Sequence, residues 1–115
     1  MRYSYGNKFF EIQINNVNRR FQFLIDGDSR FTRILLVEDD GSPYAFITTY
    51  IEDVPSTYGY LNTNNFPEIG TILEEYGFAS NTGITGESGY CSYPLYKFHP
   101  EKMEDYISPS SRLAF

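Results

Sequence analysis

The sequence is short of the residues that build most covalent and metal sites, since it holds one cysteine, one histidine and no tryptophan. Because Cys91 stands alone, an intramolecular disulfide cannot form, and a zinc site of four thiolates is excluded. We therefore predict no cofactor, no metal site and no catalytic residue, and we expect a binding protein more than an enzyme.

Long apolar runs are also missing. No stretch approaches the roughly 18 apolar residues that indicate a membrane span. Residues 1–8 lack the apolar core of a signal peptide. These absences predict a cytoplasmic protein that does not contact a membrane.

Basic residues are scarce and unevenly placed. The chain has 9 Lys and Arg against 15 Asp and Glu, for a net charge of −6. Most of the basic groups precede residue 38, and most of the acidic ones follow it. A general nucleic-acid binder carries the opposite sign, so direct nucleic-acid binding is not expected. The acidic excess is read first as ordinary solubility and second as a functional acidic surface.

Apolar residues are plentiful enough for one core. They form 41% of the 115 residues, which is the size of a single domain. We expect one domain over residues 1–115, with a strand meander at 1–53. A helix, a glycine-rich loop, a strand and a second helix follow at 54–108, and a loose tail at 109–115.

Alternation of apolar and polar residues predicts strands at 10–14, 21–25, 31–37 and 44–51, joined by Asn-rich or Gly-containing turns. Ile69, Ile72, Leu73 and Tyr76 form one helical stripe that Gly77 ends, with Asn65 as the expected cap. The fold predicted is α+β. It has a twisted antiparallel sheet of four to six strands, a main helix at about 66–77 and a short C-terminal helix at about 100–107.

The strand expected at 90–98 contains Pro94, which cannot donate a ladder hydrogen bond, so this strand should lie at an edge or carry a bulge. His99 follows it at the entry to the last helix and is expected to serve as a cap or turn residue. On one extended segment, Cys91 and His99 would be roughly 26 Å apart, which excludes a thiol dyad.

Three other chemical motifs fail on spacing. The acidic turns at 26–29 and 38–41 are read as hairpin connections, because a calcium loop from Asp26 would place Arg30 and Phe31 where an oxygen ligand and glycine are needed. The loop at 82–89 (TGITGESG) lacks the Lys-Ser/Thr pair of a phosphate-binding loop and leads into a strand.

The aromatic excess is the strongest compositional signal, with 11 Tyr and 10 Phe. The early Phe residues alternate as core residues do, whereas Tyr gathers in the second half. Rigid tyrosines beside a glycine-rich loop favour a recognition surface for a protein partner; half-buried structural tyrosines are the alternative. We call this candidate binding surface the tyrosine surface, and it comprises Thr82, Gly83, Thr85, Gly86, Tyr90, Tyr93 and Tyr96.

Four segments together resemble a known family: residues 61–67 (LNTNNFP), 74–78 (EEYGF), 82–90 (TGITGESGY) and 93–98 (YPLYKF). They are similar to a family of small bacterial proteins of unknown function, found in gut Bacteroidetes and Firmicutes and often near mobile elements. The resemblance covers residues 58–106. It implies that the Asn-rich turn and the Thr-Gly loop are shared features, and it transfers no catalytic residue.

Three functions stay open on the sequence. The favoured one is a small cytoplasmic non-catalytic binding or accessory protein with a protein partner. The second is an acidic inhibitor or nucleic-acid mimic that acts on a host defence or mobile-element protein, which would need its carboxylates in one stripe. The third is a small enzyme with an unrecognised site. Partner identity and oligomeric state do not follow from the sequence.

Overall fold

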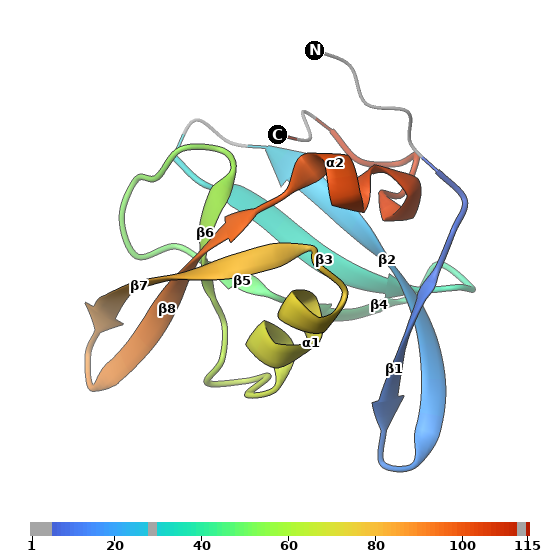
Figure 1. Ribbon diagram of the computed structural model, residues 1–115, viewed down its shortest axis with the longest axis horizontal. Helices are drawn as coiled ribbons and strands as arrows, with labels where there is room; N and C mark the ends of the chain where they lie inside the picture. The colour runs from blue at the N-terminus through green and yellow to red at the C-terminus, as the bar shows by residue number, and fades with distance from the viewer. Residues whose placement is uncertain (1–5, 28–29, 113–114) are drawn as a thin grey trace.

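The computed structural model describes residues 6–27, 30–112 and 115. Within them the chain forms two four-stranded antiparallel sheets and two short α-helices (Figure 1). The first sheet has the order β1 (Phe10–Ile14), β2 (Val17–Gly27), β3 (Thr32–Glu38), β4 (Pro43–Phe46). The second has the order β5 (Thr48–Thr49), β6 (Tyr58–Leu61), β8 (Cys91–Phe98), β7 (Ala79–Ser88). The helices are α1 (Ile69–Glu75) and α2 (Pro100–Met103), and α2 continues into a 3-10 turn, η1 (Glu104–Tyr106).

The predicted α+β class is confirmed, but the single sheet is wrong. The stretch 44–51, read as one strand, is divided at Ile47, where the chain leaves the first sheet and enters the second. At this crossing the Ile47 N–H donates to the carbonyl of Ile34, and the buried Thr48 hydroxyl accepts the Ile34 N–H. Strand β3 is therefore held by both sheets.

The loop predicted at 82–89, where the residues show no apolar alternation, is wrong up to Ser88, because these residues belong to strand β7. It pairs with β8 over most of its length, so backbone hydrogen bonding rather than burial makes it a strand. It forms an edge of the second sheet, and most of its side chains are polar and exposed.

The edge position predicted for the strand at 90–98 is wrong, because β8 lies between β6 and β7. The alternative, a bulge in this strand, is also not what the structure has: the register shifts between Asn81 and Thr85, so the extra residues lie in β7, opposite the Tyr96–Pro94 step of β8. Pro94 also lies just beyond the last β6 pair, Tyr60 with Leu95, so its missing N–H interrupts no described β6 bond.

The two predicted helices exist with shorter bounds. Helix α1 begins at Ile69 after Glu68, so the Asn65 cap is wrong; residues 62–66 form hydrogen-bonded turns instead. Gly77 follows the helix at a φ of 75°, as its stop signal predicts. None of the described helices combines the length and hydropathy needed to cross a bilayer.

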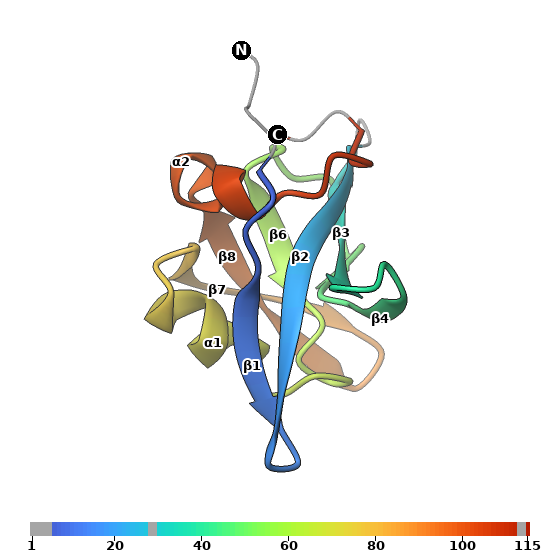
Figure 2. The same cartoon turned by 90° about the vertical axis from the view of Figure 1, so that its right-hand side faces the viewer.

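Aromatic rings fill the core between the first sheet and helix α1. Phe10, Phe21 and Phe23 are buried, which confirms the reading of the early phenylalanines. Phe10 stacks on Phe23 at 4.7 Å between centroids, and Phe78 meets both rings edge-on at 5.2 Å. Strand β1 is thereby fixed beside the end of α1 (Figure 2).

Candidate functional site

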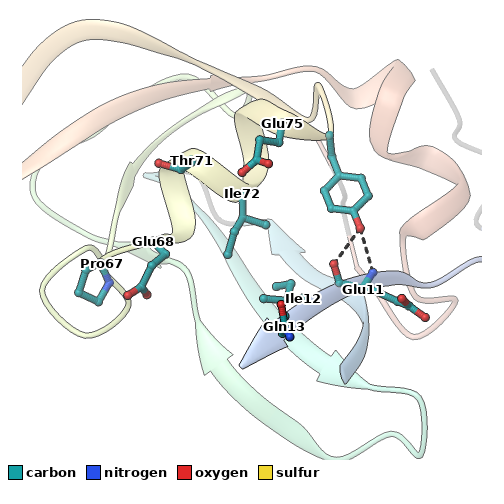
Figure 3. Close-up of a pocket in the computed structure, with 9 residues that line it drawn as sticks. Glu11, Ile12, Gln13, Pro67, Glu68, Thr71, Ile72 and Glu75 are labelled. Atoms are coloured by element: carbon teal, nitrogen blue, oxygen red, sulfur yellow. Dashed lines mark hydrogen bonds between the residues drawn. The ribbon is translucent and has the colours of Figure 1, made fainter. Parts of the chain in front are cut away.

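An open groove of about 810 Å³ runs between strand β1 and helix α1 (Figure 3). It continues towards the β1–β2 turn as a second hollow of about 630 Å³, which shares Ile12, Gln13, Glu68 and Ile72 with the first. We call the two together the β1–α1 groove. The first part is lined by Glu11, Ile12, Gln13, Pro67, Glu68, Thr71, Ile72, Glu75 and Tyr76.

The floor of the groove is apolar. Ile12 is 5% exposed because alternate residues of β1 point into the core. Ile72 packs against that core from α1 but stays half-buried, and its side chain points towards Ile12 (Figure 3). Towards the turn, the rings of Tyr44 and Phe66 meet edge-on at 6.3 Å.

The rims of the groove carry negative charge. Glu68 and Glu75 stand at the two ends of α1, and Glu11 lies on β1 opposite them. All three are exposed, and no described cation is within salt-bridge distance of them. The described lining residues include no Lys, Arg or His, so an occupant meets an uncompensated negative potential.

Tyr76 closes one end of the groove. Its hydroxyl donates to the Glu11 carbonyl at 2.7 Å and accepts the Glu11 N–H at 3.2 Å (Figure 3). The ring stacks on Phe78 at 5.2 Å with an interplanar angle of 5°. The Tyr76 side chain thus hydrogen-bonds both the N–H and the C=O of Glu11, which point away from β2.

The tyrosines of the tyrosine surface do not all lie at the surface, because Tyr96 is buried and Tyr90 is exposed. Tyr96 is 4% exposed; its ring packs over Gly70, and its hydroxyl donates to Glu74 at 3.2 Å. Burial, followed by the nearby Glu74 carboxylate, raises the pKa of Tyr96. Tyr96 therefore belongs to the core beneath α1 and is not part of an exposed surface.

The remaining tyrosines lie towards the β7–β8 turn. Tyr90 is fully exposed in that turn, next to Gly89 at a φ of 63°. Tyr93 is half-buried, and a hydrogen bond with Cys91 raises its pKa.

The Thr-Gly residues of that surface have local structural roles. Thr82 donates its hydroxyl to the Leu95 carbonyl and accepts the Ile84 N–H, so it stabilises the β7 bulge. Gly83 has a φ of 82°, and Gly86 leaves room for the Tyr60 ring. Thr85 is exposed beside them.

The structure keeps apart Cys91 and His99, the pair considered for thiol catalysis. Cys91 and His99 lie at opposite ends of β8. His99 does occupy the N-cap of α2, but its ring meets Ser80 Oγ at 2.7 Å instead of capping the helix. This pair lines none of the hollows described above. Among the described residues, no three His, Cys, Asp or Glu side chains gather as metal ligands would.

The acidic turns serve mainly local contacts. The Asp40 carboxylate accepts hydrogen bonds from Ser42, which lower its pKa, as in a hairpin connection. In the turn at 26–29, Asp28 and Ser29 lie outside the described residues. The carboxylates that a nucleic-acid mimic would need in one stripe stand on the end of β3 and the β3–β4 turn, the β5–β6 loop, α1 and the α2–η1 segment (Figure 1). They are Glu38, Asp39, Asp40, Glu52, Asp53, Glu74, Glu75, Glu101, Glu104 and Asp105. Several are paired, including Glu38 with Arg19 at 2.9 Å.

Residues 25–111 match the model of a family described as "Domain of unknown function (DUF4313)". The chain belongs to this family. The match includes the stretch 58–106 on which the resemblance was based. No curated protein and no solved structure matches the chain significantly. The bacterial setting and the nearby mobile elements stay predictions.

The DUF4313 match covers only one wall of the groove. Helix α1 lies inside residues 25–111, whereas strand β1 precedes them. The sequence does not predict this groove, because the apolar patterns of β1 and α1 indicate core elements only. One signal was present: Glu68, Ile72 and Glu75 follow the helical spacing i, i+4, i+7, which places two carboxylates on either side of an apolar residue on one face.

Proposed function

We propose that this DUF4313 protein is a non-catalytic binding or accessory protein whose β1–α1 groove holds a positively charged segment of a partner protein. One observation carries the proposal. An apolar floor formed by Ile12 and Ile72 is flanked by the carboxylates of Glu68 and Glu75 on α1, Glu11 lies beside it on β1, and no described cation is within salt-bridge distance of these groups.

Charge complementarity supports this partner class. Aliphatic stems of Lys and Arg pack on apolar surface while their charged heads reach outward, so they suit an apolar floor with acidic rims. A nucleic acid would be repelled by the same carboxylates. The net charge of −6 adds a long-range attraction for a basic partner.

The shape of the groove supports a chain segment more than a compact small molecule. Small-molecule sites usually enclose most of the ligand surface. Here the two hollows adjoin along β1 and lie open between exposed side chains such as Gln13, Thr71 and Glu75. An elongated occupant could contact both hollows at once.

A display experiment tests the proposal. The full chain is used to select from a phage-displayed library of random twelve-residue peptides. We expect selected peptides to be enriched in Lys and Arg. In a fluorescence anisotropy titration, the double variant Glu68→Lys, Glu75→Lys should bind a selected synthetic peptide at least tenfold more weakly than the parent chain does.

The matched control is the double variant Glu87→Lys, Glu101→Lys. It changes the net charge by the same amount at exposed positions of β7 and α2, away from the groove. It should keep most of the affinity. Equal losses in both variants would show a non-specific charge effect, and a library that yields no groove-dependent peptide would disprove the proposal.

A further inference from the structure

We infer that the segment bound in the β1–α1 groove is extended and adds a strand to the free edge of β1. This inference rests on the proposed function and specifies how that site binds. The occupant is a partner segment with apolar residues at alternate positions and Lys or Arg between them.

The hairpin register shows which backbone groups face the groove. Asn15 and Asn16 both have positive φ, 51° and 64°, as in the two-residue turn that joins tightly paired strands. Ile14 is opposite Val17 and Ile12 is opposite Arg19, so the bonds to β2 fall on the even positions. The N–H and C=O of Glu11 and Gln13 therefore point to the free edge.

The contact between Glu11 and Tyr76 confirms this direction. Both backbone groups of Glu11 bond to the Tyr76 hydroxyl, which lies on the side of β1 away from β2. Gln13 has the same orientation two residues further along. Among the described residues, no partner is recorded for its N–H or C=O.

Part of this edge is already occupied, because the Tyr76 hydroxyl bonds to both backbone groups of Glu11. Proteins commonly protect edge strands in this way, because an open edge pairs with other chains. The position left open, Gln13, is the one that faces the apolar floor and the acidic rim.

The space beside β1 and the side chains around it suit an added strand. An added strand would lie about 4.8 Å from β1, in the open hollow that Gln13, Ile72 and Thr71 line. Inward side chains of an added strand would meet Ile12 and Ile72, and outward ones would meet the Glu11 carboxylate. Strand addition gives affinity through backbone bonds and specificity through alternate side chains.

Charge argues against a second copy of this chain in the groove. Pairing β1 with β1 of another copy would bring Glu11 and its neighbouring carboxylates against their own equivalents. Like charges placed opposite each other on adjacent strands are destabilising. A partner segment that carries Lys or Arg removes that repulsion.

Two substitutions at Gln13 test the inference with a basic twelve-residue peptide from the display library. Gln13→Pro removes the outward N–H without removing a bond to β2, and proline is tolerated on edge strands. We expect this variant to bind the peptide at least tenfold more weakly than the parent chain does. Gln13→Ala keeps the N–H and should stay within about twofold of the parent chain.

A peptide scan on the unaltered protein keeps the test independent of how well Gln13→Pro folds. N-methylation of one peptide amide at a time should weaken binding at alternate positions, because alternate amides face β1. Strand addition would be overturned if the peptide bound in the groove but showed no alternation in the effect of N-methylation, and if both Gln13 variants bound it equally well. That result would leave the proposed function intact. Failure to find any groove-dependent peptide would overturn both. Dimerisation through β1, abolished by Gln13→Pro, would overturn the choice of occupant.

Discussion

Gly86 shows how a residue of a glycine-rich segment can be required by packing. A Cβ added there would lie 2.6 Å from a carbon of the Tyr60 ring and 3.0 Å from Ile51. Tyr60 is 2% exposed, and its hydroxyl is bonded to Glu52, so the ring has little freedom to move away. The glycine therefore permits a close approach of the ring to β7.

We predict that Gly86→Ala destabilises the protein by about 2 kcal/mol, as overpacking of a buried site does. Thr85→Ala is the control, because Thr85 is the exposed neighbour on the same strand. Its change in the free energy of unfolding should stay within about 0.5 kcal/mol. Urea titrations followed by circular dichroism measure both values. A Gly86→Ala protein as stable as the parent would show that the Tyr60 ring can shift.

The hydrogen bond between Tyr60 and Glu52 makes a separate prediction about alkaline pH. The Tyr60 hydroxyl donates to Glu52 Oε2 at 2.6 Å, and this bond, with burial and the carboxylate charge, raises the pKa of Tyr60. A raised pKa in the folded state contributes stability that is complete below the unfolded value of about 10 and is lost as the pH rises beyond it.

We therefore expect the free energy of unfolding to fall as the pH rises above about 10. Tyr60→Phe should show a shallower fall than the parent chain, since it has no hydroxyl to ionise at this position. Urea unfolding at a series of alkaline pH values provides the measurement. Identical slopes for the two proteins would rule out a contribution from this bond.

At the scale of elements, a buried hydroxyl contributes two of the hydrogen bonds at the crossing between the sheets. Thr48 Oγ1 accepts the Ile34 N–H at 3.0 Å and donates to the Thr32 carbonyl at 2.9 Å. Thr48 is 5% exposed, so water cannot readily replace these bonds. The side chain takes the place of a ladder hydrogen bond between β3 and β5.

Thr48→Val should cost about 2 kcal/mol, because it leaves a buried N–H and a buried C=O with one partner fewer. Thr49→Val, at the half-buried neighbouring position, should have a much smaller effect. Thermal and urea unfolding of the two variants would measure the difference. Equal effects would show that the Thr48 hydroxyl does not join the sheets.

The elements that could be predicted from sequence are those whose signal is local. The Asn-rich turn after β1, the early Phe alternation and the stop at Gly77 each reflect a backbone or burial preference of a few neighbouring residues. Strand β7 could not be predicted in this way. Its strand character comes from its pairing with β8, and its polar side chains leave no period of two.

The candidate site escaped prediction for a related reason. Glu11 and Glu75 are far apart in sequence, and each looks like an ordinary exposed charge on its own element. The packing of Phe10, Phe78 and Tyr76, with the hydrogen bonds from Tyr76 to Glu11, brings β1 beside α1 and creates the groove. Tyr96 illustrates the converse: a tyrosine that composition suggested as surface is buried under α1 by its contact with Gly70.

At the scale of the whole molecule, two surfaces compete as the place where a partner binds. One is the β1–α1 groove, with its apolar floor and acidic rims. The other is the exposed part of the tyrosine surface near Tyr90 and Tyr93. They lie on different parts of the molecule, since the β7–β8 turn projects away from the β1–β2 hairpin (Figure 1).

One measurement separates these two surfaces most directly. The ¹⁵N-labelled full chain is titrated with a basic twelve-residue peptide from the display library, and the shifts of backbone amides are mapped onto the structure. Binding in the groove predicts the largest changes at Gln13, Thr71 and Glu75, with little change at Tyr90. Changes centred on Tyr90 and Tyr93, with those groove amides unaffected, would contradict the account.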